Sequence, residues 1–478
     1  MSVAAAVDHA PGLERAFSFL PEERSRPLEK VLGDLPRFLR GTYYLNGPAR
    51  FERAGLRYRH WLDGDGMVSA LRFGADGVHL TSRFVRSAKW TAEEDAGRPL
   101  FRTFGTTFPG DQLVRGIALQ SPVNVSVYPF AGRLLALGEQ GLPWELDPET
   151  LETRGTYTFG GGLNPISPFA AHPKIDPESG ELWNFGVSFS STQPCVNLYR
   201  FSPEGTLLER RRAPLDLACS LHDFCLTARH AVFHLGPYRL DMEGMARHGR
   251  TVMDSLTWEP ERGTRLLILP READRPPLTV PIGNRYCLHT INGFEAGNRL
   301  TVDLVELDRP VYDQYQEVPD LFTDVAPGRP VRLVVDLEKG ELVGREEIAY
   351  DRAPDFPAID PGLLGHPYDD LWMLGISAAG QPGRKFFDQL VHATWSRPQH
   401  LDLWNAPAGH YLGGEPAFVA NPDRPGEGAV LCQLFDAMNQ ESAFAVFDAR
   451  RVAAGPVAVL PLDTPLHLGF HAVFHPDD

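Results

Sequence analysis

The sequence lacks several features that mark common classes of protein. Its five cysteines are an odd number with no close CxxC pair, so no disulfide scaffold is expected and a reducing cytoplasm fits best. No apolar run is long enough to span a bilayer, and the N-terminus has no basic and apolar secretory signal. Lys and Arg number 46 against 62 Asp and Glu, a net charge of −16, which argues against a nucleic-acid partner.

Helical signals are also scarce, whereas strand signals are common. The 45 glycines and 42 prolines separate short β-prone runs, a pattern typical of an all-β protein. These runs are 134–137, 231–234, 300–307, 331–335, 443–447 and 457–460. One short amphipathic helix is predicted where Leu13, Ala16, Phe17 and Leu20 share a helical face, and another helical turn or two at 386–394.

The size of the chain suits a large closed β architecture. Seven propeller blades of roughly 40–50 residues each would occupy about 300 residues and leave the rest for long loops. A pair of large β-sandwiches fits the strand signals equally well. We expect residues 1–30 to form an N-terminal extension with the short helix, and residues 31–478 a single β domain without an internal linker.

Four histidines in four different short motifs favour the propeller. They are His172 in Ala-His-Pro-Lys-Ile-Asp, His222 in Leu-His-Asp-Phe, His289 in His-Thr-Ile-Asn-Gly-Phe-Glu and His471 in Gly-Phe-His. The chain has 16 histidines, and a single one is more often an ordinary hydrogen-bonded or surface residue than a ligand. A propeller channel, however, brings residues from distant blades together. Neutral imidazoles without thiolates suit Fe(II), Cu or Zn, and a redox iron with open coordination positions is favoured.

Two other polar segments are expected to be structural. His60, Asp63 and Asp65 lie in a Gly-rich segment that lacks the spacing of a calcium loop, so a tight turn is predicted. His467 lies four residues before His471 in an extended stretch, and we expect it on the surface or in the channel.

Several longer segments resemble one known family. They are Gly33-Asp-Leu-Pro, Leu39-Arg-Gly-Thr-Tyr-Tyr-Leu-Asn-Gly-Pro48, His60-Trp-Leu-Asp-Gly-Asp-Gly-Met67 and Leu146-Asp-Pro-Glu-Thr-Leu-Glu-Thr153. Asp448-Ala, Gly455-Pro-Val and Gly469-Phe-His471 follow in the same order. With all four histidines in register, the chain resembles the carotenoid cleavage oxygenases nearly from end to end.

The resemblance implies a seven-bladed β-propeller with a cap of loops and short helices. It also implies a non-haem Fe(II) on the propeller axis, with O2 as co-substrate. The implied iron ligands are His172, His222, His289 and His471. Three carboxylates would accept the other ring N–H of three of these histidines, which orients the rings. The matching positions are Glu139, Asp355 and Glu415.

Asp355 departs from the family pattern, which usually has Glu before Phe-Pro. The missing methylene shortens the side chain by about 1.5 Å. Three consequences are open: the backbone shifts, a water bridges the gap, or the residue holds His289 less tightly. A plain turn carboxylate is the alternative role for Asp355.

The implied reaction is O2-dependent cleavage of a conjugated C=C bond of a carotenoid or apocarotenoid. Stilbene- or phenylpropenoid-cleaving enzymes of the family carry a Lys where this chain has Gly138, which disfavours that alternative. Hydrolysis and isomerisation of a retinoid ester, or a non-catalytic binding propeller, are further alternatives. The expected partner is a hydrophobic polyene, with no obligate protein partner. The Leu13–Leu20 face either contacts a membrane peripherally or docks onto its own protein.

Overall fold

The predicted strand runs lie in antiparallel sheets. The computed structural model describes residues 8–116, 118–189, 193–311 and 317–477, and each of the six runs lies within one strand. These strands are β9 (Arg133–Leu137), β17 (His230–Leu235), β23 (Arg299–Leu307), β24 (Gly328–Asp336), β32 (Glu441–Asp448) and β33 (Pro456–Pro461). The interiors of five of these strands are largely buried because neighbouring sheets cover both of their faces, whereas β33, near the outer edge of its blade, alternates buried and more exposed residues.

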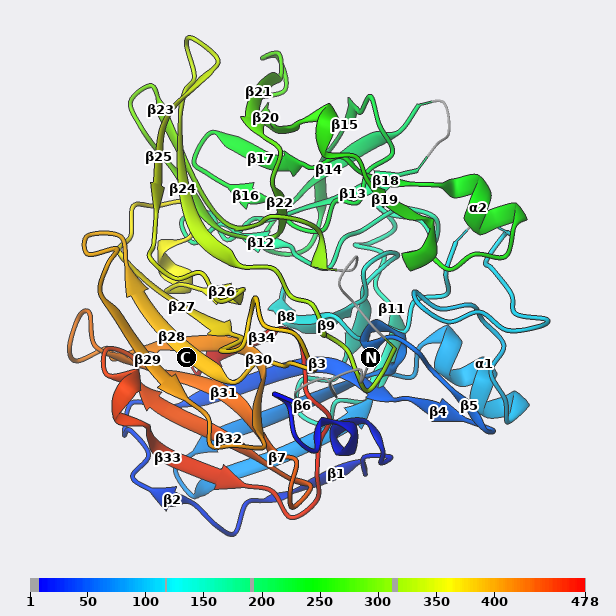
Figure 1. Cartoon of the computed structure of the whole chain (residues 1–478), viewed down its shortest axis with the longest axis vertical. Helices are drawn as coiled ribbons and strands as arrows, with labels where there is room; N and C mark the ends of the chain where they lie inside the picture. The colour runs from blue at the N-terminus through cyan, green and yellow to red at the C-terminus, as the bar shows by residue number, and fades with distance from the viewer. Residues whose placement is uncertain (1–7, 117, 190–192, 312–316, 478) are drawn as a thin grey trace, which may run out of the picture.

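Seven antiparallel sheets of four or five strands form a closed ring in the described residues (Figure 1). The predicted seven-bladed β-propeller is therefore confirmed, and the β-sandwich alternative is wrong. Two additional two-stranded sheets lie outside the blades: β4 (Glu52–Arg53) with β5 (Leu56–Arg57), and β18 (Tyr238–Leu240) with β19 (Leu256–Trp258).

The first three blades, given from outermost to innermost strand, come from the N-terminal part of the chain, except for the C-terminal strand β34. The first comprises β1 (Arg24–Pro27), β7 (Gly77–Phe84), β6 (Asp65–Gly74), β3 (Gly41–Arg50) and β34 (Ala472–Pro476). The second comprises β11 (Thr153–Thr156), β10 (Trp144–Leu146), β9 and β8 (Ser126–Phe130). The third comprises β15 (Leu207–Pro214), β14 (Cys195–Phe201), β13 (Leu182–Ser188) and β12 (Lys174–Ile175).

Four blades follow in chain order, again given from outermost to innermost strand. The fourth comprises β21 (Leu278–Gly283), β20 (Thr264–Pro270), β17 and β16 (Cys225–Leu226). The fifth comprises β25 (Glu341–Glu347), β24, β23 and β22 (Tyr286–Ala296). The sixth comprises β29 (Leu401–Asn405), β28 (Gln389–Thr394), β27 (Asp370–Gly375) and β26 (Asp355–Ala358). The seventh comprises β2 (Leu32–Gly33), β33, β32, β31 (Gly428–Asp436) and β30 (His410–Ala420).

The two ends of the chain close the ring in the same blade. Strand β34 pairs with β3, with Leu45 opposite Ala472, so the last described strand completes a sheet that begins near the N-terminus. Strand β1 forms the outer edge of that sheet and lies within the predicted N-terminal extension. The boundary at residue 31 stays a prediction, and residues 1–7 of the extension lie outside the described residues.

The short N-terminal helix docks onto the propeller. It is the 3-10 helix η1 (Leu13–Phe17), and Leu13, Ala16 and Phe17 are buried in the core. Leu20 is 59% exposed, so only the first three predicted positions share the buried face. Because this apolar face packs on its own protein, it does not form a free membrane-binding surface.

His467 is buried beneath this segment, so the predicted surface or channel position is wrong. Its side chain is 5% exposed, and its ring nitrogens lie 2.5 Å from the Ala16 carbonyl oxygen and 2.9 Å from that of Phe19. The Phe19 ring stacks on it at 4.1 Å between centroids. This contact joins segments near the two ends of the chain. The residues around His467 in the sequence therefore do not reveal that it is buried.

The predicted helical turn at 386–394 is also wrong. Residues 389–394 form the central strand β28, which is buried along its whole length. The sequence of so short a segment does not distinguish a buried strand from a helical turn, because the neighbouring strands that bury it leave no local signal.

Few other helices occur in the described part of the chain. They are α1 (Ala88–Ala96), α2 (Met242–Arg247), η2 (Trp61–Asp63), η3 (Met253–Ser255), η4 (Pro260–Arg262), η6 (Pro361–Leu363) and η7 (Val452–Ala454). Helix α1 was not predicted; it begins after Ser87, whose hydroxyl accepts the Trp90 N–H, and ends at Gly97 with φ +63°. Of the helices in the described residues, none has the length and apolarity needed to cross a membrane.

The segment with His60, Asp63 and Asp65 forms the predicted tight turn. The imidazole Nδ1 of His60 accepts the Leu62 N–H at 3.0 Å, and the Asp63 carboxylate accepts the His60 N–H at 3.0 Å. This reciprocal capping starts η2 and connects it to β6.

Candidate metal centre

The four histidines expected to bind a metal lie on or next to innermost strands of the blades, close to the propeller axis. Strands β8, β12, β26 and β34 meet near the centre of the ring (Figure 1). Three histidines lie one to three residues before an innermost strand: His172 before β12, His222 before β16 and His471 before β34. His289 lies within β22. The propeller therefore converts distant sequence positions into neighbours, as expected from the histidine distribution.

The four histidines converge on one point. One ring nitrogen from each of His172, His222, His289 and His471 lies within 4.8 Å of the others. The Nε2 atom of His222 lies 2.9 Å from that of His172 and 3.1 Å from that of His289. A metal bound at about 2.1 Å from each nitrogen requires ligand atoms this close together. The spacing therefore fits one ion better than four independent polar side chains.

Burial favours the neutral, ligating form of two of the rings. It holds the pKa of His172 and His471 well below the ordinary value, and the neighbouring imidazoles lower both further. For His222, burial acts in the same direction, but the carboxylates of Glu139, Asp223 and Asp355 together outweigh it and raise the pKa.

Three carboxylates hold the outward ring nitrogens of three histidines. The Nδ1 atom of His222 lies 2.8 Å from Glu139 Oε2. The other pairs are His289 Nδ1 with Asp355 Oδ1 at 2.5 Å and His471 Nδ1 with Glu415 Oε2 at 3.2 Å. Because Nδ1–H donates to the carboxylate, the Nε2 lone pair is turned towards the shared centre. The structure thus brings together all seven site residues expected from the sequence.

Asp355 contacts His289 directly despite its shorter side chain. It opens β26, and the pairing of β26 with β27 shifts register between Asp355 and Ala358. The next residue, Phe356, has φ +50°, and its N–H donates to Asp355 Oδ1. The irregular backbone places the carboxylate within reach, so no water needs to bridge the pair. Burial raises the pKa of Asp355, but the contact with His289 and the hydrogen bond from the Phe356 N–H outweigh it, so that the pKa is lowered overall.

The charge balance around the axis favours an external cation. Lys174 pairs with Asp223 at 2.8 Å, but no Lys or Arg of the described residues forms an ion pair with Glu139, Asp355 or Glu415. Burial raises the pKa of Glu415 to about 7, as expected for a buried carboxyl group that forms no ion pair with a lysine or arginine. A divalent cation among the four imidazoles would offset the negative charge of these carboxylates. The residues present therefore fit a bound metal in both geometry and charge.

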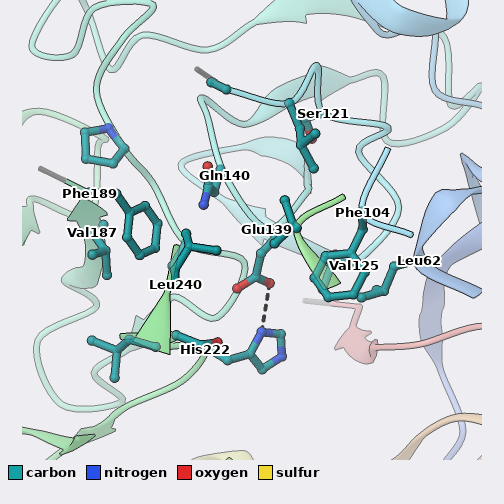
Figure 2. Close-up of a pocket in the computed structure, with 18 of the residues that line it drawn as sticks. Leu62, Phe104, Ser121, Val125, Glu139, Gln140, Val187, Phe189, His222 and Leu240 are labelled. Atoms are coloured by element: carbon teal, nitrogen blue, oxygen red, sulfur yellow. Dashed lines mark ion pairs between the residues drawn. The ribbon is translucent and has the colours of Figure 1, made fainter. Parts of the chain in front are cut away.

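An apolar cavity reaches the histidine cluster from one side (Figure 2). Leu62, Phe104 and Val125 line it on one side of Glu139, and Val187, Phe189 and Leu240 on the other. A second cavity continues past the cluster and is lined by aromatic side chains. These are Trp61, Phe322, Phe356, Phe387 and Phe470. Leu62, Val125, His222 and Leu288 line both cavities.

The cavity-lining residues were not predicted individually. Leu62, Val125 and Leu288 are apolar, and in a sequence they resemble any other core residue. Lys174, Asp223 and Thr290, which surround the histidine cluster, were also missed. Their sequence signal is a polar residue one or two positions after each of three histidines.

The fold and the site define a class of protein: a seven-bladed β-propeller with four histidines on its axis that could hold a metal ion. A family model described as retinal pigment epithelial membrane protein matches residues 17–476. The chain belongs to this family, the same one predicted from sequence as the carotenoid cleavage oxygenases.

Curated relatives include enzymes with different substrates. The chain is 28% identical over 493 residues to apocarotenoid-15,15'-oxygenase of Synechocystis sp., covering 95% of this chain and 94% of the relative. It is 29% identical over 457 residues to isoeugenol monooxygenase of Pseudomonas putida, covering 92% and 93%. The crystal structure of cobalt-substituted Synechocystis ACO superimposes with a TM-score of 0.89 at 25% identity, covering 98% of this chain and 100% of that one.

Proposed function

We propose that this protein is a non-haem Fe(II) dioxygenase that cleaves a conjugated C=C bond of a carotenoid or apocarotenoid. One O2 molecule contributes both of its atoms, and the products are two carbonyl compounds. The observation that carries the proposal is the convergence of four imidazole nitrogens at the inner end of an apolar cavity. A curated relative acts on apocarotenoids by name, and a similar structure holds cobalt.

The side chains around the axis have distinct roles in this proposal. His172, His222, His289 and His471 hold the iron, and Glu139, Asp355 and Glu415 orient three of the rings. Iron, when bound, supplies the activation of O2 that the protein's own side chains lack. The apolar walls keep water away from the reacting bond and align the substrate with the centre.

The cavity favours a polyene over a phenol-anchored substrate. A Cβ atom at Gly138 would lie 2.0 Å from Ser121 Oγ, so a Lys at this position, as in stilbene cleavers, would require the Ser121 side chain to move. Phe104, in the segment where a phenol-binding Tyr would be expected, gives the wall an apolar ring (Figure 2). Neither residue offers a hydrogen bond to a phenolic oxygen.

Such a substrate would come from a membrane, and peripheral contact with one is part of this proposal. The residues that support it are Leu20 and Ile166, which are 59% and 62% exposed. Ile166 lies two residues before Pro168, which lines the cavity. The placement in the cytoplasm stays a prediction.

The test is substrate cleavage by the iron-loaded protein. We would incubate it with β-carotene, an apocarotenal, a hydroxystilbene, isoeugenol and a retinyl ester under 18O2, then identify products by mass. We expect two labelled carbonyl products from a polyene and none from His222→Ala. Cleavage of the phenolic alkenes alone would favour the alternative substrate class. An alcohol without any aldehyde would indicate an isomerohydrolase, and failure to bind iron would indicate a non-catalytic propeller.

A further inference from the structure

Three polar side chains form a buried bridge beside the metal centre, which we call the cross-tie: Lys174, Asp223 and Thr290. Lys174 Nζ lies 2.8 Å from Asp223 Oδ1. Asp223 Oδ2 accepts the Thr290 backbone N–H at 2.9 Å and its hydroxyl at 2.7 Å. The Phe224 N–H donates to Asp223 Oδ1 at 2.8 Å, so both carboxylate oxygens have partners.

The cross-tie joins three consecutive blades. Lys174 opens β12, Asp223 precedes β16, and Thr290 lies within β22. Each is one or two residues beyond a histidine of the metal centre: Lys174 follows His172, Asp223 follows His222, and Thr290 follows His289. A contact between these residues therefore fixes the spacing of the backbone segments that carry the three rings.

The cross-tie is buried enough to constrain those segments. The side chain of Asp223 is 3% exposed and that of Lys174 17% exposed. A buried charge that loses its partner is strongly destabilising, so the two charges hold each other in place. The fourth histidine is positioned differently: the His471 N–H donates to the Val125 carbonyl, and its own carbonyl accepts the Asn46 N–H.

We propose that the cross-tie is a positioning device for the metal centre. It holds His172, His222 and His289 at the separation that a single metal ion requires, before the metal arrives. Lys174, Asp223 and Thr290 are positioning residues, because they act through the histidines and do not contact the ion. This inference rests on the proposed metal-binding function and extends it to residues outside the histidine–carboxylate pairs.

Cobalt binding to the metal-free protein tests the proposal without relying on activity. Co(II) would be titrated into wild type, Lys174→Met, Asp223→Asn and the milder Thr290→Val, with the d–d absorption spectrum recorded. We expect the dissociation constant to rise about 10–100-fold for the first two variants, as for other residues that support metal ligands, with a changed spectrum. Thr290→Val, which keeps the ion pair, should raise it about fivefold, the effect of one hydrogen bond. The double variant Lys174→Met/Asp223→Asn should be less impaired than the two single effects combined.

Lys89→Met is the matched control. Lys89 forms a buried ion pair with Asp65 at 2.7 Å in another blade. This variant should lower the melting temperature of the metal-free protein but leave the cobalt affinity and spectrum unchanged.

Two outcomes separate this inference from the proposed function. If wild type binds cobalt and the cross-tie variants lower only the melting temperature, the cross-tie is purely structural and the inference is overturned alone. If wild type itself binds neither iron nor cobalt, the proposed function fails, and the inference fails with it.

Discussion

Two clusters of buried polar side chains in this protein differ in the groups that face their carboxylates. Beside α1, at the periphery of the ring (Figure 1), Arg53, Asp65, Lys89 and Glu93 form what we call the α1 ion cluster. Lys89 lies 2.7 Å from Asp65 and 2.9 Å from Glu93, and all three side chains are fully buried. On the axis, three carboxylates face histidines instead.

The difference is in the source of positive charge. Burial raises the pKa of Asp65, but the charges and hydrogen bonds of Lys89 and Arg53 together outweigh it and keep the carboxyl ionised. The α1 ion cluster is therefore complete without a ligand. The carboxylates on the axis have no such partner, and the pKa of Glu415 is raised to about 7. A cluster with its own lysine and arginine stabilises the fold, whereas one whose carboxylates face imidazoles instead of lysine or arginine is suited to a metal.

Removing a histidine of the metal centre should produce the largest effect, a loss of iron and of activity. In His289→Ala, three imidazoles remain, and the aligned Asp355 loses its partner. We expect iron at well below one equivalent and a fall in kcat of at least about 1,000-fold, the range seen when a catalytic group is removed. Iron content by mass spectrometry and product formation measure these effects. Full iron occupancy in this variant would contradict the assigned ligand set.

Breaking the α1 ion cluster should have the opposite result: it should lower the stability of the fold and leave iron binding unchanged. Lys89→Met leaves Asp65 and Glu93 buried without their lysine, which should cost about 3–5 kcal/mol of unfolding free energy. Iron content per folded molecule should stay at the wild-type level. Urea unfolding and metal analysis of the same preparation measure both quantities; a loss of iron in step with stability would mean that the clusters are not independent.

Lowering the pH should destabilise the histidine-rich axis first. His234 lines a small cavity with His222 and Asp223, and burial lowers its pKa from 6.5 to about 4. Because the unfolded state then binds the proton more readily, the stability from this group is present above pH 6.5 and is lost as the pH falls towards 4. The loss for one such group is about 2–3 kcal/mol.

The test is to measure the unfolding free energy of the metal-free protein from pH 7.5 to 4 and to determine its slope against pH. His234→Gln, which does not titrate in this range, should have a shallower slope than wild type. Lys89→Met should have the wild-type slope, because Lys89 stays charged throughout. Equal slopes for His234→Gln and wild type would show that His234 does not contribute to the loss of stability at low pH.

The smallest effects on iron binding should come from the carboxylates that contact the histidines, and they should differ between the exposed Glu139 and the more buried Asp355. The side chain of Glu139 is 40% exposed at the open cavity, whereas that of Asp355 is 15% exposed. A hydrogen bond that is screened by solvent contributes less to holding the histidine ring in place. Asp355→Asn should therefore weaken iron binding about 10–100-fold, and Glu139→Gln less than about 10-fold. Chelator competition measures both. A larger effect at Glu139 would show that exposure does not set the contribution of these carboxylates.

Much of the fold was predictable because its signals are local. The six β-prone runs, separated by Gly and Pro, all form strands, and the spread of the histidines favours a closed ring. The predicted helical turn at 386–394 and the predicted surface or channel position of His467 were wrong for the same reason. Blade neighbours bury β28 on both faces, and the N-terminal segment covers His467, but neither contact leaves a local signal.

The candidate site was predictable to a similar extent. The resemblance selected four histidines and three carboxylates, and the structure brings all seven together. Their role as ligands and ligand partners stays a prediction. Whether Asp355 reaches His289 was open, because reach depends on the backbone: the register shift in β26 and the positive φ of Phe356 place the carboxylate 2.5 Å from the ring.

The sequence by itself determined the all-β class, the family and the residues able to bind a metal, because strand propensity and ligand chemistry belong to individual side chains. Only the tertiary structure decided which charges would be neutralised within the protein. Lys89 and Lys174 are both lysines in the sequence, yet one completes an ion cluster and the other spans the blades beside the metal centre. That difference arises from the closure of the ring, which sets the distance between residues far apart in the chain.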